Sequence, residues 1–143
     1  NKTEGAMLVF LRTLGFDYRT ERARHEVAKT FPFSSAKKRM STLVASPGGV
    51  GGGILYTKGA SEIVTDMCRL YLAQDGSKQA LDENMRADIM ANIDTMAGAG
   101  LRTIGLAFHQ TSDVGVVKGL EDAPTAEMDM VFVGLVGIRD PPR

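Results

Sequence analysis

Apolar residues recur at helical spacing in three parts of the chain. The spacing predicts one helix over residues 6–14, a second over residues 61–71, and a third from Asp82, its N-cap, to a stop at Gly98 or Gly100. The residues that carry these three periods are Ala6, Met7, Phe10, Leu11, Leu14, Ile63, Val64, Met67, Cys68, Tyr71, Met85, Ile89, Ile93 and Met96.

Five other segments are dominated by apolar, aromatic and β-branched residues and predict strands. They cover residues 27–33, 40–46, 54–58, 102–109 and 130–138. Helices do not separate these strands regularly, so a doubly wound parallel sheet is disfavoured. The order predicts an α+β fold, with a mostly antiparallel β-sheet flanked by helices.

A glycine-rich segment, Pro47–Gly53, joins the second and third predicted strands. A phosphate-binding P-loop has Lys followed by Ser or Thr directly after its last glycine, and a helix behind it. Here Ile-Leu-Tyr follows, which is typical of a strand, so we expect a turn or hairpin loop instead. A long loop is also expected from residue 110 to Asp129.

Composition and charge exclude several classes of function. The chain has 143 residues, enough for one domain with its own core, and its 17 basic residues balance 17 acidic ones. A balanced charge gives no reason to expect nucleic acid or anionic lipid as a partner. The best apolar run, residues 130–138, is far shorter than the roughly 18 residues that a membrane-spanning helix needs.

Cysteine and histidine are too scarce to suggest metal or nucleophilic chemistry. Cys68 is the single cysteine, so no internal disulfide can form and a reducing compartment is the simpler interpretation. It lies on the apolar face of the second predicted helix, which favours a core position over a nucleophile. His25 and His109 lie far apart in the sequence, and their spacing does not resemble a zinc site.

The segment from Phe31 to Ser41 places an aromatic residue close to a cationic cluster. Phe33 closes one predicted strand, and Lys37, Lys38 and Arg39 precede the next. An aromatic ring can stack on a purine, for about 1–3 kcal/mol, and a nearby ammonium favours phosphate. The residues alone leave a second interpretation open, in which Phe33 is a core residue beside a solvated basic turn.

The segment Lys58–Glu62 ends a predicted strand and opens a predicted helix. Gly59 would let a ligand approach the backbone, and the helix start offers free N–H groups to an anion. The alternative is a strand-to-helix turn that carries an exposed lysine.

Taken together, these segments resemble the nucleotide-binding domain of P-type cation-transporting ATPases. The elements that carry the resemblance, in order, are Lys2-Thr3-Glu4, Phe33-Ser34 with Lys38 and Met40, Lys58-Gly59-Ala60-Ser61-Glu62, Leu101-Arg102-Thr103, and Gly137-Ile138-Arg139-Asp140-Pro141-Pro142-Arg143. The segments NKTE, YTKGASEIV and VGIRDPPR look most like those of calmodulin-regulated, plasma-membrane-type calcium pumps. Sarcoplasmic-reticulum-type, secretory-pathway and sodium pumps share the same ordered elements but differ in the local sequence of each element.

The resemblance implies a set of contacts around the adenine base of ATP. Phe33 would stack on adenine, and Glu4 would accept a hydrogen bond from its exocyclic amine, which gives preference over guanine. Lys58 would line the floor of the adenine pocket, with Gly59 and Ile104 as its close walls.

The resemblance also implies contacts near the phosphates. Lys38 would lie beside the nucleotide as a second cation, and Arg102 would reach the phosphate groups. Some relatives carry a basic residue two positions after the stacking aromatic, where this chain has Ser35. Part of the phosphate contact is therefore missing unless Lys37 or Arg39 substitutes.

The resemblance further implies that the chain is a piece of a longer protein. Residues 1–138 match the nucleotide-binding domain without its first strands, and residues 139–143 match a hinge toward the phosphorylation domain, with Asp140 and Arg143 as hinge residues. The phosphorylated-aspartate motif DKTGT and the magnesium-binding motif GDGxND do not occur in the sequence. The implied function is to present the γ-phosphate of Mg-ATP to an aspartate on another domain of a calcium-transporting pump.

This interpretation defines the expected partners and the competing hypotheses. We expect ATP and the phosphorylation and actuator domains of the same chain as partners, and a monomeric fragment without membrane contact or catalysis of its own. Its place would be the cytoplasmic side of an integral membrane protein. The competing hypotheses are the same domain of another P-type cation pump, a fragment that hydrolyses ATP alone, and a regulatory module that docks a partner protein through residues 37–39.

Overall fold

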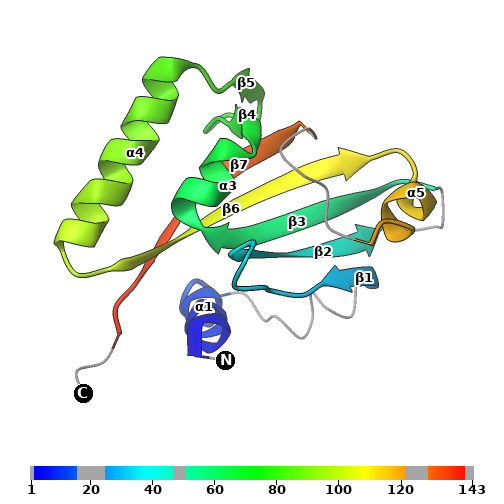
Figure 1. The fold of residues 1–143 in the computed structure, drawn as a ribbon, viewed down its shortest axis with the longest axis horizontal. Helices are drawn as coiled ribbons and strands as arrows, with labels where there is room; N and C mark the ends of the chain where they lie inside the picture. The colour runs from blue at the N-terminus through cyan, green and yellow to red at the C-terminus, as the bar shows by residue number, and fades with distance from the viewer. Residues whose placement is uncertain (1, 16–24, 47–50, 122–128, 141–143) are drawn as a thin grey trace.

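The computed structural model describes residues 2–15, 25–46, 51–121 and 129–140, and its main element is a seven-stranded sheet (Figure 1). The strand order is β1-β2-β3-β6-β7-β4-β5. The strands are β1 (Glu26–Phe31), β2 (Arg39–Ala45), β3 (Gly53–Ala60), β4 (Cys68–Leu72), β5 (Lys78–Ala80), β6 (Arg102–Thr111) and β7 (Met130–Ile138). The helices are α1 (Lys2–Thr13), α3 (Ser61–Asp66), α4 (Glu83–Gly98) and α5 (Val114–Lys118).

Neighbouring strands in this sheet are antiparallel, except that β4 pairs in parallel with β7. The predicted α+β fold with a mostly antiparallel sheet is therefore confirmed. β2 and β3 form the expected hairpin, because Ala45 pairs with Gly53 and the Ser46 amide donates to the Gly52 carbonyl at 2.9 Å. Residues 47–50 of its glycine-rich loop lie outside the described part of the chain.

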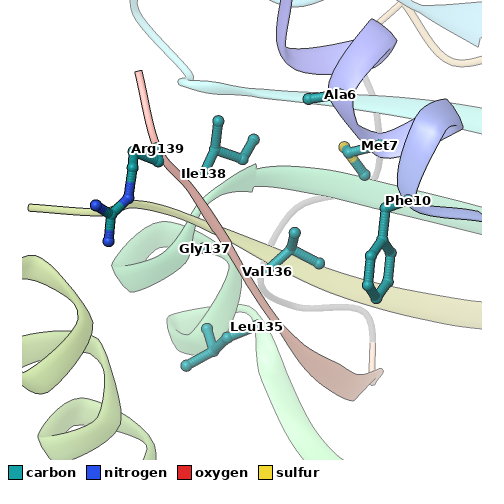
Figure 2. A pocket seen from close by; sticks show the side chains of 8 residues that line it. All are labelled: Ala6, Met7, Phe10, Leu135, Val136, Gly137, Ile138 and Arg139. Carbon is teal, nitrogen blue, oxygen red and sulfur yellow. The ribbon is translucent and has the colours of Figure 1, made fainter. Parts of the chain in front are cut away.

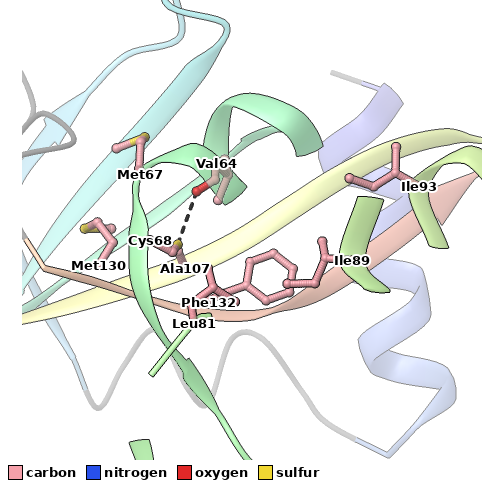
Figure 3. Close-up of a cluster of buried hydrophobic side chains, with 9 residues drawn as sticks. All are labelled: Val64, Met67, Cys68, Leu81, Ile89, Ile93, Ala107, Met130 and Phe132. Carbon is pink, nitrogen blue, oxygen red and sulfur yellow. Dashed lines mark hydrogen bonds between the residues drawn. The ribbon is translucent and has the colours of Figure 1, made fainter. Parts of the chain in front are cut away.

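The larger core lies between the sheet and helices α3 and α4 (Figure 3). Its buried members are Val64, Met67, Cys68, Leu81, Ile89, Ile93, Ala107, Met130 and Phe132. Ile89 and Ile93 are the buried residues of α4, one helical turn apart. The predicted N-cap of this helix is confirmed, because the Asp82 carboxylate accepts a hydrogen bond from the Met85 amide at 2.8 Å.

Cys68 is a core residue, as the sequence predicts, and only 1% of it is exposed. Burial raises the pKa of its thiol to about 12, although the charge of Arg86 acts in the opposite direction. The thiol donates a hydrogen bond to the Val64 carbonyl oxygen at 3.2 Å (Figure 3). A buried thiol with a raised pKa holds little thiolate, so Cys68 is unsuited to nucleophilic chemistry.

A second core, under α5, lies on the same face of the sheet. Its buried members are Phe31, Leu43, Leu55 and Val117. The Lys29 ammonium donates to the carbonyl oxygens of Lys118 and Leu120, at 3.0 and 2.6 Å, and so places a positive charge at the C-terminal end of α5.

The prediction of a helix over residues 61–71 is wrong beyond Asp66. The chain leaves α3 there, and Cys68–Leu72 forms β4, which pairs with β7 and β5. The apolar residues of this stretch fit helical spacing and also a short buried strand, so the pattern could not separate the two. The structure also contains α5 and β5, which the sequence pattern did not predict.

Arg86 holds this helix-to-strand junction together from α4. Its guanidinium donates to the carbonyl oxygens of Thr65 and Cys68, at 2.9 and 3.0 Å. Both of these residues are buried, at 0% and 1% exposure, so their carbonyl groups depend on protein donors. The side chain of Arg86 therefore supplies one donor to the last turn of α3, at Thr65, and a second to the first residue of β4, at Cys68.

Replacing Arg86 by Met should therefore destabilise the fold. We expect Arg86→Met to lower the free energy of unfolding by about 1–3 kcal/mol, because it leaves two buried carbonyl groups without their charged donor. Urea unfolding followed by circular dichroism measures this change. The matched control is Arg69→Met, whose side chain is 68% exposed and pairs with Asp129 on the surface. An equal loss in both variants would contradict the prediction.

Candidate functional site

An ion pair joins helix α1 to the face of the sheet that α3, α4 and α5 leave uncovered. Side chains alternate along a strand, so Lys58 points away from the face on which Leu55 and Thr57 are buried. Its ammonium lies 3.0 Å from the Glu4 carboxylate, with side-chain exposures of 25% for Lys58 and 45% for Glu4. Two residues that are 54 positions apart in the sequence therefore meet at one point.

The neighbouring strands place apolar residues beside this ion pair. Met40 on β2 and Leu106 on β6 are the Cα partners of Lys58, and both are half-buried. Ile104 is the Cα partner of Ala60, so it lies on the same face of the sheet, one step along from Leu106. Lys58 therefore lies among apolar residues of the neighbouring strands, which we call the apolar floor.

Gly59 is the point at which β2 and β3 approach each other most tightly at this end of the sheet. A Cβ atom added there would lie 2.4 Å from the Lys38 carbonyl oxygen and 2.7 Å from the Arg39 Cα. The Lys38 carbonyl also accepts a hydrogen bond from the Ala60 amide at 2.9 Å. The close approach of β2 therefore requires glycine at position 59, whether or not a ligand also approaches the backbone there.

Phe33 lies in the connection between β1 and β2, just past the end of β1. Its side chain is 62% exposed, whereas Phe31 is 5% exposed and belongs to the second core. The core role that the sequence left open for Phe33 is filled by Phe31 instead. The connection then turns sharply: the Lys38 amide donates to the Ser34 carbonyl at 2.8 Å, and Lys38 has a positive φ of 56°.

The cationic cluster at residues 37–39 is only partly open to solvent. Lys38 is exposed, while Lys37 and Arg39 are half-buried. Within the described part of the chain, the Nε atom of Arg39 is buried with no hydrogen-bond partner. This cluster is therefore a poor surface for docking a partner protein through three solvent-facing charges.

Arg102 and Asp140 form a second ion pair at the same end of the sheet. Arg102 is the first residue of β6, and its Cα partner is Ile138, the last residue of β7. Its guanidinium donates to the Asp140 carboxylate at 2.9 Å, with side-chain exposures of 49% and 67%. The sequence predicted a role for each residue but did not predict this contact.

A pocket of 340 Å³ lies between α1 and β7 (Figure 2). It is lined by Ala6, Met7, Phe10, Leu135, Val136, Gly137, Ile138 and Arg139. Figure 2 shows Met7 and Phe10 projecting from α1 toward β7. The residues that were predicted to bind the nucleotide are not among the pocket's lining residues, and its walls are apolar apart from Arg139.

The structure thus gathers most of the predicted binding residues at one end of the sheet. Glu4 contacts Lys58, the backbone of Lys38 contacts Gly59 and Ala60, and Ile104 lies on the adjacent strand. Phe33 belongs to the connection that ends at Lys38. Arg143 lies outside the described residues, so its predicted hinge role stays a prediction.

The described residues contain no group of three His, Cys, Asp or Glu side chains placed to hold a metal ion. His109 lies 3.2 Å from the Asp129 carbonyl oxygen through its Nδ1 atom, and His25 is exposed. In the same part of the chain, no helix combines the length and the apolar character that a membrane crossing requires.

Comparisons with known proteins agree on one family. A family model described as P-type ATPase, cytoplasmic domain N, matches residues 1–143. The chain is similar to Calcium-transporting ATPase PAT1 of Dictyostelium discoideum, with 40% identity over 143 residues, which is 100% of this chain and 12% of that protein. It is also similar to Calcium-transporting ATPase 4, plasma membrane-type, of Arabidopsis thaliana, with 39% identity over 144 residues, 99% of this chain and 13% of that protein.

A human relative has a similar match. Plasma membrane calcium-transporting ATPase 4 of Homo sapiens is 36% identical over 147 residues, which covers 100% of this chain and 12% of that protein. The chain therefore spans only 12% to 13% of the length of these curated relatives.

The tight backbone approach at Gly59 generates a prediction about stability. We expect Gly59→Ala to lower the free energy of unfolding by about 1–3 kcal/mol, because the added methyl group meets backbone atoms that cannot move aside. Urea unfolding measures the change. Gly134→Ala on β7 is the control, since a Cβ atom there meets nothing within 4 Å. If the two variants were equally stable, the constraint at Gly59 would be refuted.

Proposed function

This chain belongs to the family of P-type ATPase cytoplasmic N domains, and on that premise we propose that it binds ATP on the sheet face that carries Lys58. The observation that carries the proposal is the meeting of Glu4 and Lys58 from elements far apart in the sequence. A carboxylate that accepts and an ammonium that donates, beside an apolar floor, are the groups that orient a purine in a mostly apolar site.

The adenine base would bind between Phe33 and the floor formed by Lys58 and its neighbours. An exposed aromatic ring can stack on a base for about 1–3 kcal/mol, and 62% of Phe33 is open to solvent. The Glu4 carboxylate only accepts hydrogen bonds, so it would select the exocyclic amine of adenine against the carbonyl oxygen of guanine. Gly59 and Ile104 would form the close walls.

The phosphates would extend toward Arg102, with Lys38 as a second cation beside the nucleotide. Arg102 stands at the start of β6, at the end of the sheet where the chain leaves β7, and its guanidinium geometry suits phosphate oxygens. Ser35 supplies no charge at the position where some relatives have a basic residue. Lys37 and Arg39 are half-buried, which argues against either one replacing that charge fully.

With one stacked base and few charged contacts, binding by this chain alone should be weak. We expect a dissociation constant of about 0.1–1 mM, which corresponds to about −4 to −5.5 kcal/mol. The γ-phosphate would project into solvent, and any magnesium would arrive bound to the phosphates. Transfer to an aspartate on a neighbouring domain would then depend on positioning by domain closure.

The parent protein would be a calcium-transporting pump. This step rests on similarity to proteins whose names describe calcium transport, at 36% to 40% identity. The chain would act as a cytoplasmic domain of that pump, with the phosphorylation and actuator domains as its partners. Hydrolysis of ATP would require those domains, so this chain alone should release no phosphate above a buffer control.

Removing the stacking ring or the ammonium tests the site directly. We expect Phe33→Ala and Lys58→Ala each to raise the dissociation constant for ATP by at least about fivefold, measured by NMR titration of the 143-residue chain. In the unaltered chain, ATP should shift the signals of Phe33, Lys58 and Arg102 together.

Val116→Ala and Lys118→Ala are the controls for this experiment. Val116 is 64% exposed and Lys118 is also exposed, and both lie on α5, on the opposite face of the sheet. Both variants should bind ATP as the unaltered chain does. Unchanged affinity in either test variant would show that the site is misplaced, and shifts confined to residues 37–39 would favour a protein-docking module.

Base selection by Glu4 gives a separate prediction. The unaltered chain should bind ATP more tightly than GTP, and Glu4→Gln should reduce this ratio several-fold, because the glutamine amide can donate to the guanine carbonyl oxygen. Competition titrations with both nucleotides give the ratio. A general loss of folding would weaken both nucleotides alike, so a ratio that does not change would contradict the assignment.

A further inference from the structure

The pair between Arg102 and Asp140 links the proposed phosphate end of the site to the chain segment that leaves the sheet. The two residues are 38 positions apart, and Asp140 is the last described residue of the chain. The guanidinium Nη2 atom donates to the Asp140 Oδ1 atom at 2.9 Å. Arg102 belongs to a strand of the sheet, whereas Asp140 lies two residues past the end of β7.

Carboxylate and phosphate oxygens bind a guanidinium in the same way. Both accept charge-assisted hydrogen bonds from its planar N–H groups. A carboxylate and a phosphate that approach the same N–H groups therefore compete for them. Arg102 faces the side of the sheet that carries Ile104 and Lys58, because these positions share one face of neighbouring strands. The charge of Arg102 is compensated by Asp140 in this structure.

We propose that Asp140 competes with the phosphates of ATP for Arg102, so that nucleotide binding releases the segment that follows β7. This inference rests on the proposed function, because it requires the phosphates to reach Arg102. The exchange breaks one ion pair and forms another, and no covalent step is involved. By linkage, a change that detaches Asp140 from Arg102 must also favour binding of the phosphates.

The exposure of the pair sets the size of the effect. Arg102 is 49% exposed and Asp140 is 67% exposed, and pairs of this kind are weak. A competitor of this strength lowers the affinity for ATP by about 1.5- to 5-fold. The pair is weak enough for a polyphosphate to displace, and it connects Asp140 to the first residue of β6.

The test compares ATP with adenosine, which lacks phosphates. We expect Asp140→Asn to raise the affinity for ATP by about 1.5- to 5-fold and to leave the affinity for adenosine unchanged, measured by NMR titration of the 143-residue chain. Asp140→Glu keeps the carboxylate and should bind ATP as the unaltered chain does. Asp88→Asn, at an exposed position of α4, removes the same charge elsewhere and should have no effect.

A double variant separates competition from a general structural change. In an Arg102→Gln background, Asp140→Asn should no longer alter the affinity for ATP. The backbone amide signals of residues 139 and 140 should move on addition of ATP but not of adenosine. If ATP binds and Asp140→Asn leaves its affinity unchanged or weakens it, the competition is refuted while the proposed function stands. If the unaltered chain binds neither ligand, both proposals fail.

Discussion

The pairing of β3 with β2 and β6 is the constraint on which the rest of the structure depends. This strand forms a continuous register with both neighbours, and its alternation sends Leu55 and Thr57 into the interior. Lys58 must therefore point to the opposite face. A shift of one residue would bury its ammonium and expose the core residues, so the apolar core fixes the direction of the site lysine.

The two faces of the sheet differ in how far helices cover them. Helices α3, α4 and α5 bury one face in two apolar clusters, while α1 covers the other only in part and leaves Tyr56 exposed. The stability of the domain comes mainly from the first face, because most of the buried apolar side chains are there. The second face can then keep charged and aromatic groups open to a ligand.

Two basic side chains on this second face are paired with carboxylates of the same domain. Lys58 pairs with a carboxylate from α1, and Arg102 pairs with a carboxylate from the segment after β7. Both pairs are partly exposed, so each can be rearranged at small cost when a more highly charged ligand arrives. The pairs also tie two peripheral segments to the sheet. Binding of a nucleotide at the proposed site would thereby be connected to the positions of α1 and of residues 139–140.

Much of this protein could be predicted from local pattern. The helical period of α4 and the apolar segments of β6 and β7 are long, so their types were identified correctly. The ordered motifs predicted the family that the whole-chain match confirms. Short elements could not be predicted, because residues 67–71 suit a helix as well as a strand and α5 has only five residues. Pairing with β7 and the guanidinium of Arg86 decided that junction. Which phenylalanine is buried, and which carboxylate meets Arg102, were decided by tertiary structure alone, since both depend on neighbours distant in the sequence.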